Sequence, residues 1–267
     1  MARIVSFLCQ FNDAEYLDAA IQSFKWLPDK LYIIEGSWKS SQGYSNTQLR
    51  SDPKVYNIID RHVDNKRVFL IQANEAGEKE QRQVGLEKAK EEGADWAWML
   101  DSDEVYPKLV MTQIRNMLML ALPSIHGFRV QSFNFINSFK TWYRGDYNRI
   151  YRVTPEARFV LNNDVQFYRD GRRADVLTIA ERLRFMHYNY VKADPSQFWR
   201  KMHYHETEDP TFKGRITPQY GAKGHIYTIP ADIPRYTFTG QHPAIMKDHP
   251  NIKANIYNDS DLRFAPN

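Results

Sequence analysis

The sequence predicts an α/β fold built on an open, mostly parallel sheet that is flanked by helices. Short apolar runs recur along the first 107 residues, and segments with helical periodicity stand between them. The joints between these segments are short. Alternating strands and helices with short connections favour a parallel sheet with helices on its faces.

The first half of the chain supplies four apolar runs and two helical patterns. Asn12 and Glu15 have the spacing of a capping box, so we expect the first helix to begin there. A second helix is expected over residues 78–92, where Gly93 supplies a C-terminal stop. Residues 38–53 are polar and are expected to form a loop. The runs expected to be strands are 3–9, 31–34, 67–71 and 96–100.

The second half has a different, α+β pattern, in which a helix is expected over residues 108–122. Residues 142–146 are polar and aromatic and predict a turn, and Asp194 followed by proline predicts another helix start. Strands are expected at 128–135, 148–153 and 183–190. We divide the chain, as one composite globular domain, into a first half 1–125, a second half 126–207 and an extended tail or lid 208–267.

Composition narrows the class of protein. With 42% hydrophobic and 25% charged residues the chain has the make-up of a globular protein, and its net charge of +4 suits an anionic ligand. Cys9 is the one cysteine, which excludes an internal disulfide framework and fits a reducing compartment. No signal peptide or membrane-spanning run is visible, so we expect a cytoplasmic protein, while peripheral contact with a membrane stays open. Scattered arginines without a recognition motif argue against nucleic-acid binding.

Three carboxylates follow the apolar run 96–100 directly. Asp101, Asp103 and Glu104 would lie at the carboxyl end of a buried strand, where open α/β sheets bind their ligands. Two carboxylates at i and i+2 form a hard oxygen site that suits Mg²⁺ or Mn²⁺ shared with phosphates. The alternative is a strand-ending turn, since Asp and Ser are ordinary turn residues.

The order of these motifs resembles the nucleotide-sugar glycosyltransferases of the GT-A fold, in particular family 2. The resemblance spans about residues 3–107 and rests on Asn12 after the first strand, Glu35 after the second, Arg82 at a helix start, and Asp101 with Asp103 after the fourth. It implies a GT-A-type, Rossmann-like sheet and transfer of a sugar from a nucleotide-diphosphate donor, with UDP as the expected nucleotide and inversion as the expected outcome. Residues 1–125 would then be the nucleotide-sugar-binding half, and residues 126–207 the acceptor-binding half, on the acceptor-side α+β part of the chain.

The resemblance also implies roles for single residues. Asp103 would hold the divalent cation, Mn²⁺ or Mg²⁺, and Asp101 would contact the metal's water shell or the ribose. Asn12 and Glu35 would lie at the nucleoside, and Arg82 would face the phosphates or steady the acidic loop. In the family that the chain resembles, a histidine far downstream often completes the metal site, here His187, and its imidazole would favour Mn²⁺ over Mg²⁺. The alternative for His187 is a half-buried residue bonded to a neighbour.

An inverting transfer needs a general base for the acceptor hydroxyl. Asp164, Glu181 and Asp146 are the candidates, with Asp164 first because it precedes an apolar strand. The alternative for each of them is a turn or surface carboxylate. The acceptor, whether saccharide, lipid-linked or protein, is not predicted.

Two other functions stay open at this point. A nucleotidyltransferase or metal-dependent phosphohydrolase would use a similar sheet, although the run after the first strand lacks the glycine and lysine of a nucleotidyltransferase loop. A non-catalytic sugar- or nucleotide-binding module would keep the fold without the chemistry.

Overall fold

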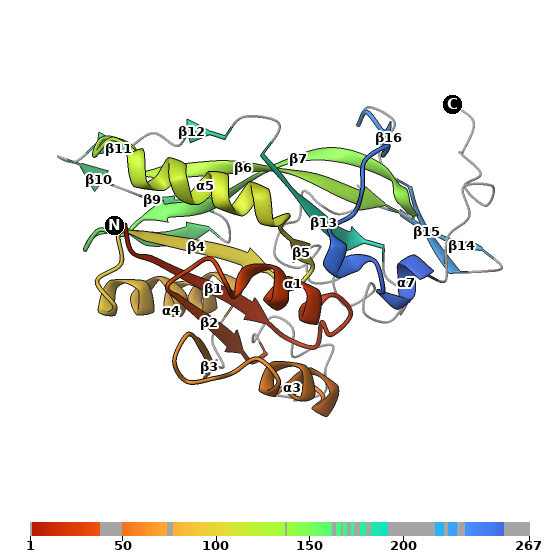
Figure 1. The fold of residues 1–267 in the computed structure, drawn as a ribbon, viewed down its shortest axis with the longest axis horizontal. Coiled ribbons are helices and arrows are strands. Elements are labelled where there is room, and N and C mark those ends of the chain that lie inside the picture. Colours follow the sequence, from red (N-terminus) through yellow and green to blue (C-terminus); the bar gives the residue numbers. More distant parts are fainter. Residues whose placement is uncertain are drawn as a thin grey trace.

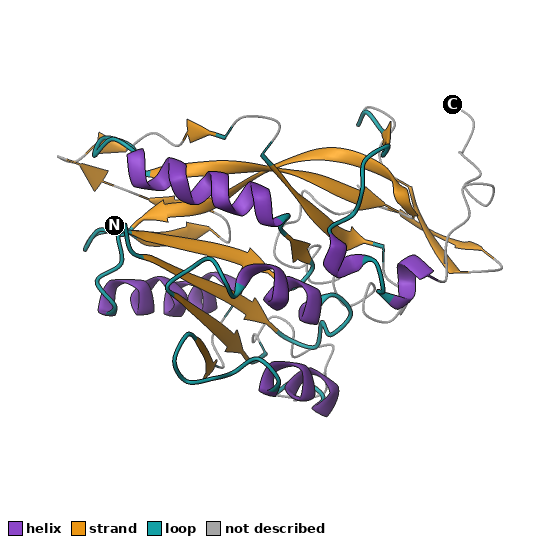
Figure 2. Ribbon diagram, viewed as in Figure 1, coloured by secondary structure: helices purple, strands orange, loops and turns teal. Residues whose placement is uncertain are grey.

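The protein folds around one curled, open sheet with helices on both faces, as the ribbon shows (Figure 1; Figure 2). This confirms the predicted α/β class. The computed structural model describes residues 2–37, 50–73, 77–136, 138–161, 164–166, 168–169, 172–173, 177–179, 183–191, 217–221, 224–228 and 233–253.

The first half of the sheet is parallel. Its strands are β1 (Ile4–Gln10), β2 (Lys30–Glu35), β3 (Val68–Gln72) and β4 (Trp96–Asp101), in the spatial order β3-β2-β1-β4. All seven residues of β1 are buried, as expected for a strand covered on both faces. The four predicted strands are therefore confirmed, and their carboxyl ends meet at one edge of the sheet.

Two apolar layers cover this parallel part. Side chains of α1 (Leu17–Phe24), α3 (Pro53–Asp60) and α5 (Lys108–Leu120) pack on one face. The opposite face is covered by α4 (Glu78–Glu91), through Leu86 and Ala89. Gly93 follows α4 with a φ of 61°, the left-handed conformation in which a helix commonly ends.

The second half of the sheet is mixed. After β4 the order continues β7 (Ser138–Arg152), β6 (Gly127–Ile136), β13 (Arg184–Tyr190) and β5 (Glu104–Val105). Here β7 is antiparallel to both β4 and β6, whereas β13 is parallel to β6. The two-residue strand β5 is antiparallel to β13. Although β5 follows β4 in the sequence, it therefore lies at the other end of the strand order, beyond β13.

Two local predictions were wrong. Residues 142–146 do not turn, because they lie inside the long strand β7 and pair with β6. Asn12 and Glu15 do not cap α1, which begins at Leu17 after Tyr16. Asn12 instead adopts a φ of 53° and bonds to the segment before α3, a helix that the sequence analysis did not predict.

The remaining elements are short. β8 pairs with β9, β10 with β11 and β14 with β15, while β12 and β16 join the edges of β6 and β7. Among the described helices none is long and apolar enough to cross a membrane. The predicted helix at Asp194 lies outside the described residues. The bounds are β8 Arg158–Leu161, β9 Asp164–Gln166, β10 Tyr168–Arg169, β11 Arg172–Arg173, β12 Leu177–Thr178, β14 Thr217–Gly221, β15 Gly224–Thr228, β16 Tyr236–Thr237, η3 Ala244–Met246 and α7 Pro250–Lys253.

Candidate functional site

Asp101, the last residue of β4, carries a carboxylate held by two arginines from different elements. Arg82 Nη2, from α4, lies 2.9 Å from Asp101 Oδ1, and Arg149 Nη2, from β7, lies 2.6 Å from Asp101 Oδ2. Burial alone would raise the pKa of Asp101, but the guanidinium groups of Arg149 and Arg82 lower it to about 2. Asp101 is therefore charged at any physiological pH, and both of its oxygens already accept hydrogen bonds.

Arg149 reaches the site because β7 bulges there. Phe128 pairs with Ile150 and Arg129 with Asn148, so Arg149 is an extra residue in the ladder. Such bulges re-aim a side chain, and they are common beside functional sites. The guanidinium of Arg149 is fully buried.

Glu104 is the second carboxylate that Arg149 holds. Both Nε and Nη2 of Arg149 donate to Glu104 Oε1, at 2.9 and 2.5 Å. Burial raises the pKa of Glu104, and Arg149 opposes that shift. Arg149 itself has a raised pKa, because the attraction of Asp101 and Glu104 exceeds the cost of burial, so the guanidinium stays charged. Arg149 thus ties the end of β4 to β5.

Asp103 and His187 face each other on the other side of this cluster. Both are buried, and His187 Nε2 lies 3.1 Å from Asp103 Oδ1. The backbone sets this approach: His187 pairs in register with Glu104, and the N–H of Tyr188 donates to the carbonyl of Asp103 at 3.0 Å. The short strand β5 therefore brings together residues from opposite halves of the chain.

The donor set fits one divalent cation. Ligand atoms of Asp101, Glu104 and His187 lie within 4.8 Å of one another, and Asp103 contacts His187. Since Arg82 also pairs with Glu78, the two guanidinium groups pair with three carboxylates, Glu78, Asp101 and Glu104, a formal charge of −1 when all are ionised. Asp103, which contacts His187, is a fourth carboxylate beside them. Carboxylate oxygens with one imidazole suit Mn²⁺ or Mg²⁺. The predicted ligands Asp101, Asp103 and His187 are thus neighbours, with Glu104 added to them.

The predicted nucleoside contacts lie at the ends of β1, which is next to β4 in the sheet, and of β2, which is next to β1. Glu35 is fully buried; its Oε1 accepts from the N–H of Ser51 at 2.7 Å, and its Oε2 accepts from the hydroxyl of Tyr56. Asn12 receives a hydrogen bond from the N–H of Asp52 and donates its own N–H to Ser51. Both predicted residues therefore anchor the start of α3, and Tyr56 is the side chain that Glu35 positions.

The three candidate bases are not gathered at this cluster by any described contact. Asp146 lies on β7, is exposed, and stands 3.5 Å from Nε of Arg144. Asp164 begins β9, where only its backbone is described, and Glu181 lies outside the described residues.

Arg149, Glu104 and Asn134 are site residues to which the sequence analysis gave no role at the metal site. Glu104 belongs to the same acidic triplet and could have been included on that ground. Arg149 was one of several arginines in the second half, and Asn134, which contacts His187 Nδ1 at 2.8 Å, sits in an aromatic strand. Neither carried a local signal, because their partners are distant in sequence.

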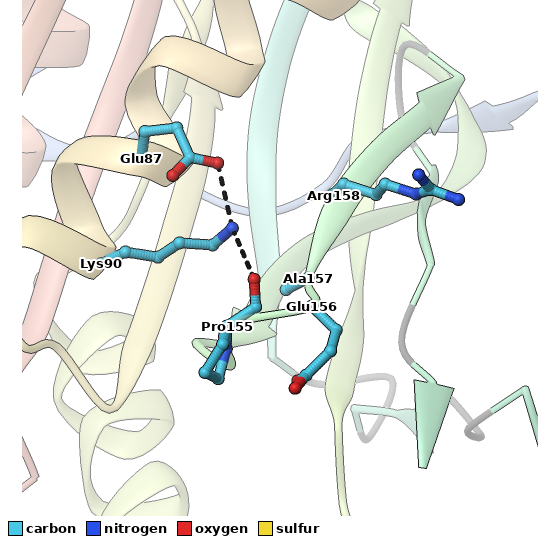
Figure 3. A pocket seen from close by; sticks show the side chains of 6 residues that line it. All are labelled: Glu87, Lys90, Pro155, Glu156, Ala157 and Arg158. Atoms are coloured by element: carbon cyan, nitrogen blue, oxygen red, sulfur yellow. Dashed lines mark hydrogen bonds and ion pairs between the residues drawn. The ribbon is translucent and has the colours of Figure 1, made fainter. Parts of the chain in front are cut away.

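A pocket of about 580 Å³ lies elsewhere, between α4 and the segment before β8 (Figure 3). Lys90 Nζ lies within it, 2.9 Å from Glu87 and 3.1 Å from the carbonyl of Pro155. Val153, two residues before Pro155, donates its N–H to the carbonyl of Asp95, just before β4. The pocket is therefore at the amino end of β4, the end opposite the carboxylates.

Comparisons with known proteins leave the family open. No family model matches the chain, and no curated protein matches it. Among solved structures, it is similar to residues 1–349 of S. aureus TarS with 10% identity and a TM-score of 0.44, over 77% of this chain and 65% of that one. The structure of TarS residues 1–349 in complex with UDP has 11% identity and a TM-score of 0.35, over 50% of this chain and 35% of that one. A cytidylyltransferase from Leptospira borgpetersenii has 11% identity and a TM-score of 0.36, over 57% of this chain and 60% of that one.

The chain thus spans less than two thirds of each of these structures, and every TM-score is below 0.5. Any functional conclusion has to come from the site itself.

Proposed function

We propose that the protein is a metal-dependent glycosyltransferase that moves a sugar from a nucleotide-diphosphate donor, UDP-linked as the first expectation, to an acceptor hydroxyl. The observation that carries the proposal is the buried cluster at the carboxyl end of β4, where His187 Nε2 and Asp103 Oδ1 lie 3.1 Å apart beside Asp101 and Glu104. Open α/β sheets bind ligands at this edge.

Asp103 and His187, with Asp101 or Glu104 beside them, would hold Mn²⁺ or Mg²⁺. When bound, the cation would act as a Lewis acid that offsets the charge on a departing diphosphate. Arg82 and Arg149 keep Asp101 ionised and fixed in place, so its carboxylate would need little rearrangement when a cation binds. Asn12, Glu35 and Tyr56 would shape the wall beside the nucleoside.

The proposed division of labour follows the chain. Residues 1–125 would bind the donor and residues 126–207 the acceptor, with 208–267 as a tail or lid. Asp164, Glu181 and Asp146 remain the proposed candidates for the general base.

Calorimetric titration of UDP and GDP, with and without Mn²⁺, tests the proposal. We expect binding that requires Mn²⁺ in the wild type, is lost in Asp103→Ala, and is retained in Glu91→Gln, which removes a carboxylate from the exposed side of α4. Absence of binding under every condition would contradict the proposal.

A second measurement separates the alternatives. Turnover of a sugar nucleotide, even slow hydrolysis to water, supports transfer over a non-catalytic module. Release of pyrophosphate from a nucleoside triphosphate would instead indicate a nucleotidyltransferase.

A further inference from the structure

Asn134 lies behind His187, on the side away from Asp103. It is fully buried on β6 and pairs in register with His187 on β13. Its Oδ1 lies 2.8 Å from His187 Nδ1. The same oxygen lies 2.9 Å from Ser132 Oγ and 3.3 Å from the hydroxyl of Tyr147. Three potential donors therefore converge on one amide oxygen.

The identity of that atom decides where the imidazole carries its proton. An amide oxygen can only accept, so the ring nitrogen that it contacts, Nδ1, has to be the protonated one. In neutral imidazole the other nitrogen, Nε2, then presents a lone pair. Nε2 faces Asp103 Oδ1, which is also an acceptor when ionised. Two acceptors 3.1 Å apart repel each other unless a cation lies between or beside them.

Gly145 leaves room for the amide of Asn134. A Cβ added at Gly145 would lie 2.2 Å from Asn134 Nδ2 and 2.5 Å from Ser132 Oγ, so a bare backbone position is needed there. The amide nitrogen is buried and has no hydrogen-bond partner. The cost of leaving that nitrogen unpaired is offset at the oxygen, where the three donors meet.

We propose that Asn134 is a positioning residue that keeps the proton of His187 on Nδ1 and so presents the lone pair of Nε2, beside Asp103, to a divalent cation. This inference rests on the proposed metal site. It assigns the ring's orientation to a residue that touches neither the cation nor the substrate.

The position of the proton can be read directly by nitrogen NMR of the metal-free, full-length protein labelled with ¹⁵N-histidine, using His187→Gln to identify the signals of His187. We expect a protonated Nδ1 in the wild type and in Asn134→Asp, which keeps an acceptor at the same place. In Asn134→Leu we expect the proton on Nε2, where it can bond to Asp103. Tyr147→Phe, which removes one of the other donors, should leave Nδ1 protonated.

A wild-type spectrum with the proton on Nε2 alone would overturn the inference, because it would mean that the amide presents its nitrogen to the ring. A leucine variant that still carries the proton on Nδ1 would overturn it equally. Thermal unfolding checks that each variant is folded, and Asn134→Asp keeps the test valid if the leucine variant is not.

Mn²⁺ affinity, followed by the electron paramagnetic resonance signal of the free ion, is the second readout. Loss of such an orienting partner typically costs about 10- to 100-fold in metal affinity, and we expect that loss in Asn134→Leu but not in Asn134→Asp. A leucine variant with wild-type affinity would overturn the inference. If the wild type binds no Mn²⁺ while Nδ1 is protonated, the proposed metal site fails and the placement of the proton stands.

Discussion

The guanidinium of Arg149 lies 2.6 Å from the carboxylate of Asp101, at the place where the parallel part of the sheet meets the antiparallel part. The same group holds Glu104, which is fully buried. A buried ion pair costs desolvation on both sides, and removing one partner leaves the other charge uncompensated. Arg149 therefore contributes both to the packing of β7 against β4 and to the placement of two site carboxylates.

Replacing Arg149 should destabilise the protein strongly. We expect Arg149→Met to lower the free energy of unfolding by about 3–5 kcal/mol, since Glu104 and Asp101 would lose a buried partner. Chemical denaturation measures the effect. Arg144→Met, on the same strand but at an exposed position, is the matched control and should change the free energy of unfolding by less than about 1 kcal/mol. Equal effects of the two substitutions would contradict this account.

The pKa of Asp101 predicts how stability depends on pH. Its pKa is lowered from 3.8 to about 2, because Arg149 and Arg82 outweigh the effect of burial. The stabilisation by the charged form is present above the unfolded pKa and is lost as pH falls through the folded one. We expect the wild type to lose about 2 kcal/mol relative to Asp101→Asn between pH 5 and pH 2. Parallel pH profiles for the two proteins would show that the carboxylate is not held as described.

Gly145 should tolerate no side chain without disturbing its neighbours. We expect Gly145→Ala to displace the amide of Asn134, because the new Cβ would lie 2.2 Å from its nitrogen. The side chain can move, so the expected cost in stability is modest, roughly 1–3 kcal/mol. Mn²⁺ affinity should fall as it does in Asn134→Leu. An alanine variant with unchanged Mn²⁺ affinity would indicate that the amide of Asn134 does not need the space that Gly145 leaves.

Tyr56 should stabilise the contact between Glu35 and the start of α3. Tyr56→Phe removes the hydroxyl that donates to Glu35 and leaves a buried carboxylate oxygen short of a donor. We expect a loss of roughly 1–3 kcal/mol in the free energy of unfolding. Tyr236→Phe, at an exposed tyrosine, is the control and should be neutral. Weaker binding of UDP in Tyr56→Phe would support the proposed position of the nucleoside.

The general base can be identified by substitution of the three candidates. Loss of a general base typically lowers a rate by about 10²- to 10⁴-fold, so one of Asp164→Asn, Glu181→Gln and Asp146→Asn should lower kcat for sugar transfer that far. The donor affinity of that variant should be unchanged. If all three retain full transfer, the base lies elsewhere.

The sequence could predict the first half of the fold because its signals are local. The strands β1 to β4 are apolar on both faces, and α4 has its inner residues at helical spacing and Gly93 at its end. Even α3 had a usable signal, since Asp52 and Pro53 have the order of an N-cap and a first helical residue.

The errors arose where tertiary contacts outweigh local preference. Asn12 looks like a helix cap, but its backbone N–H and its side-chain oxygen are engaged by the segment before α3. Residues 142–146 look like a turn because they are polar and aromatic, yet β6 pairs with them along their whole length. Arg149 could not be placed at all, because a bulge in one ladder aims it.

The two-residue strand β5 makes the order of synthesis matter. Glu104 and Asp103 leave the ribosome early, but His187, which pairs with one and contacts the other, follows 84 residues after Asp103. A nascent chain can therefore complete β1 to β4 while its acidic triplet still lacks the imidazole. The four side chains of the proposed ion site are therefore complete only after translation has passed β13.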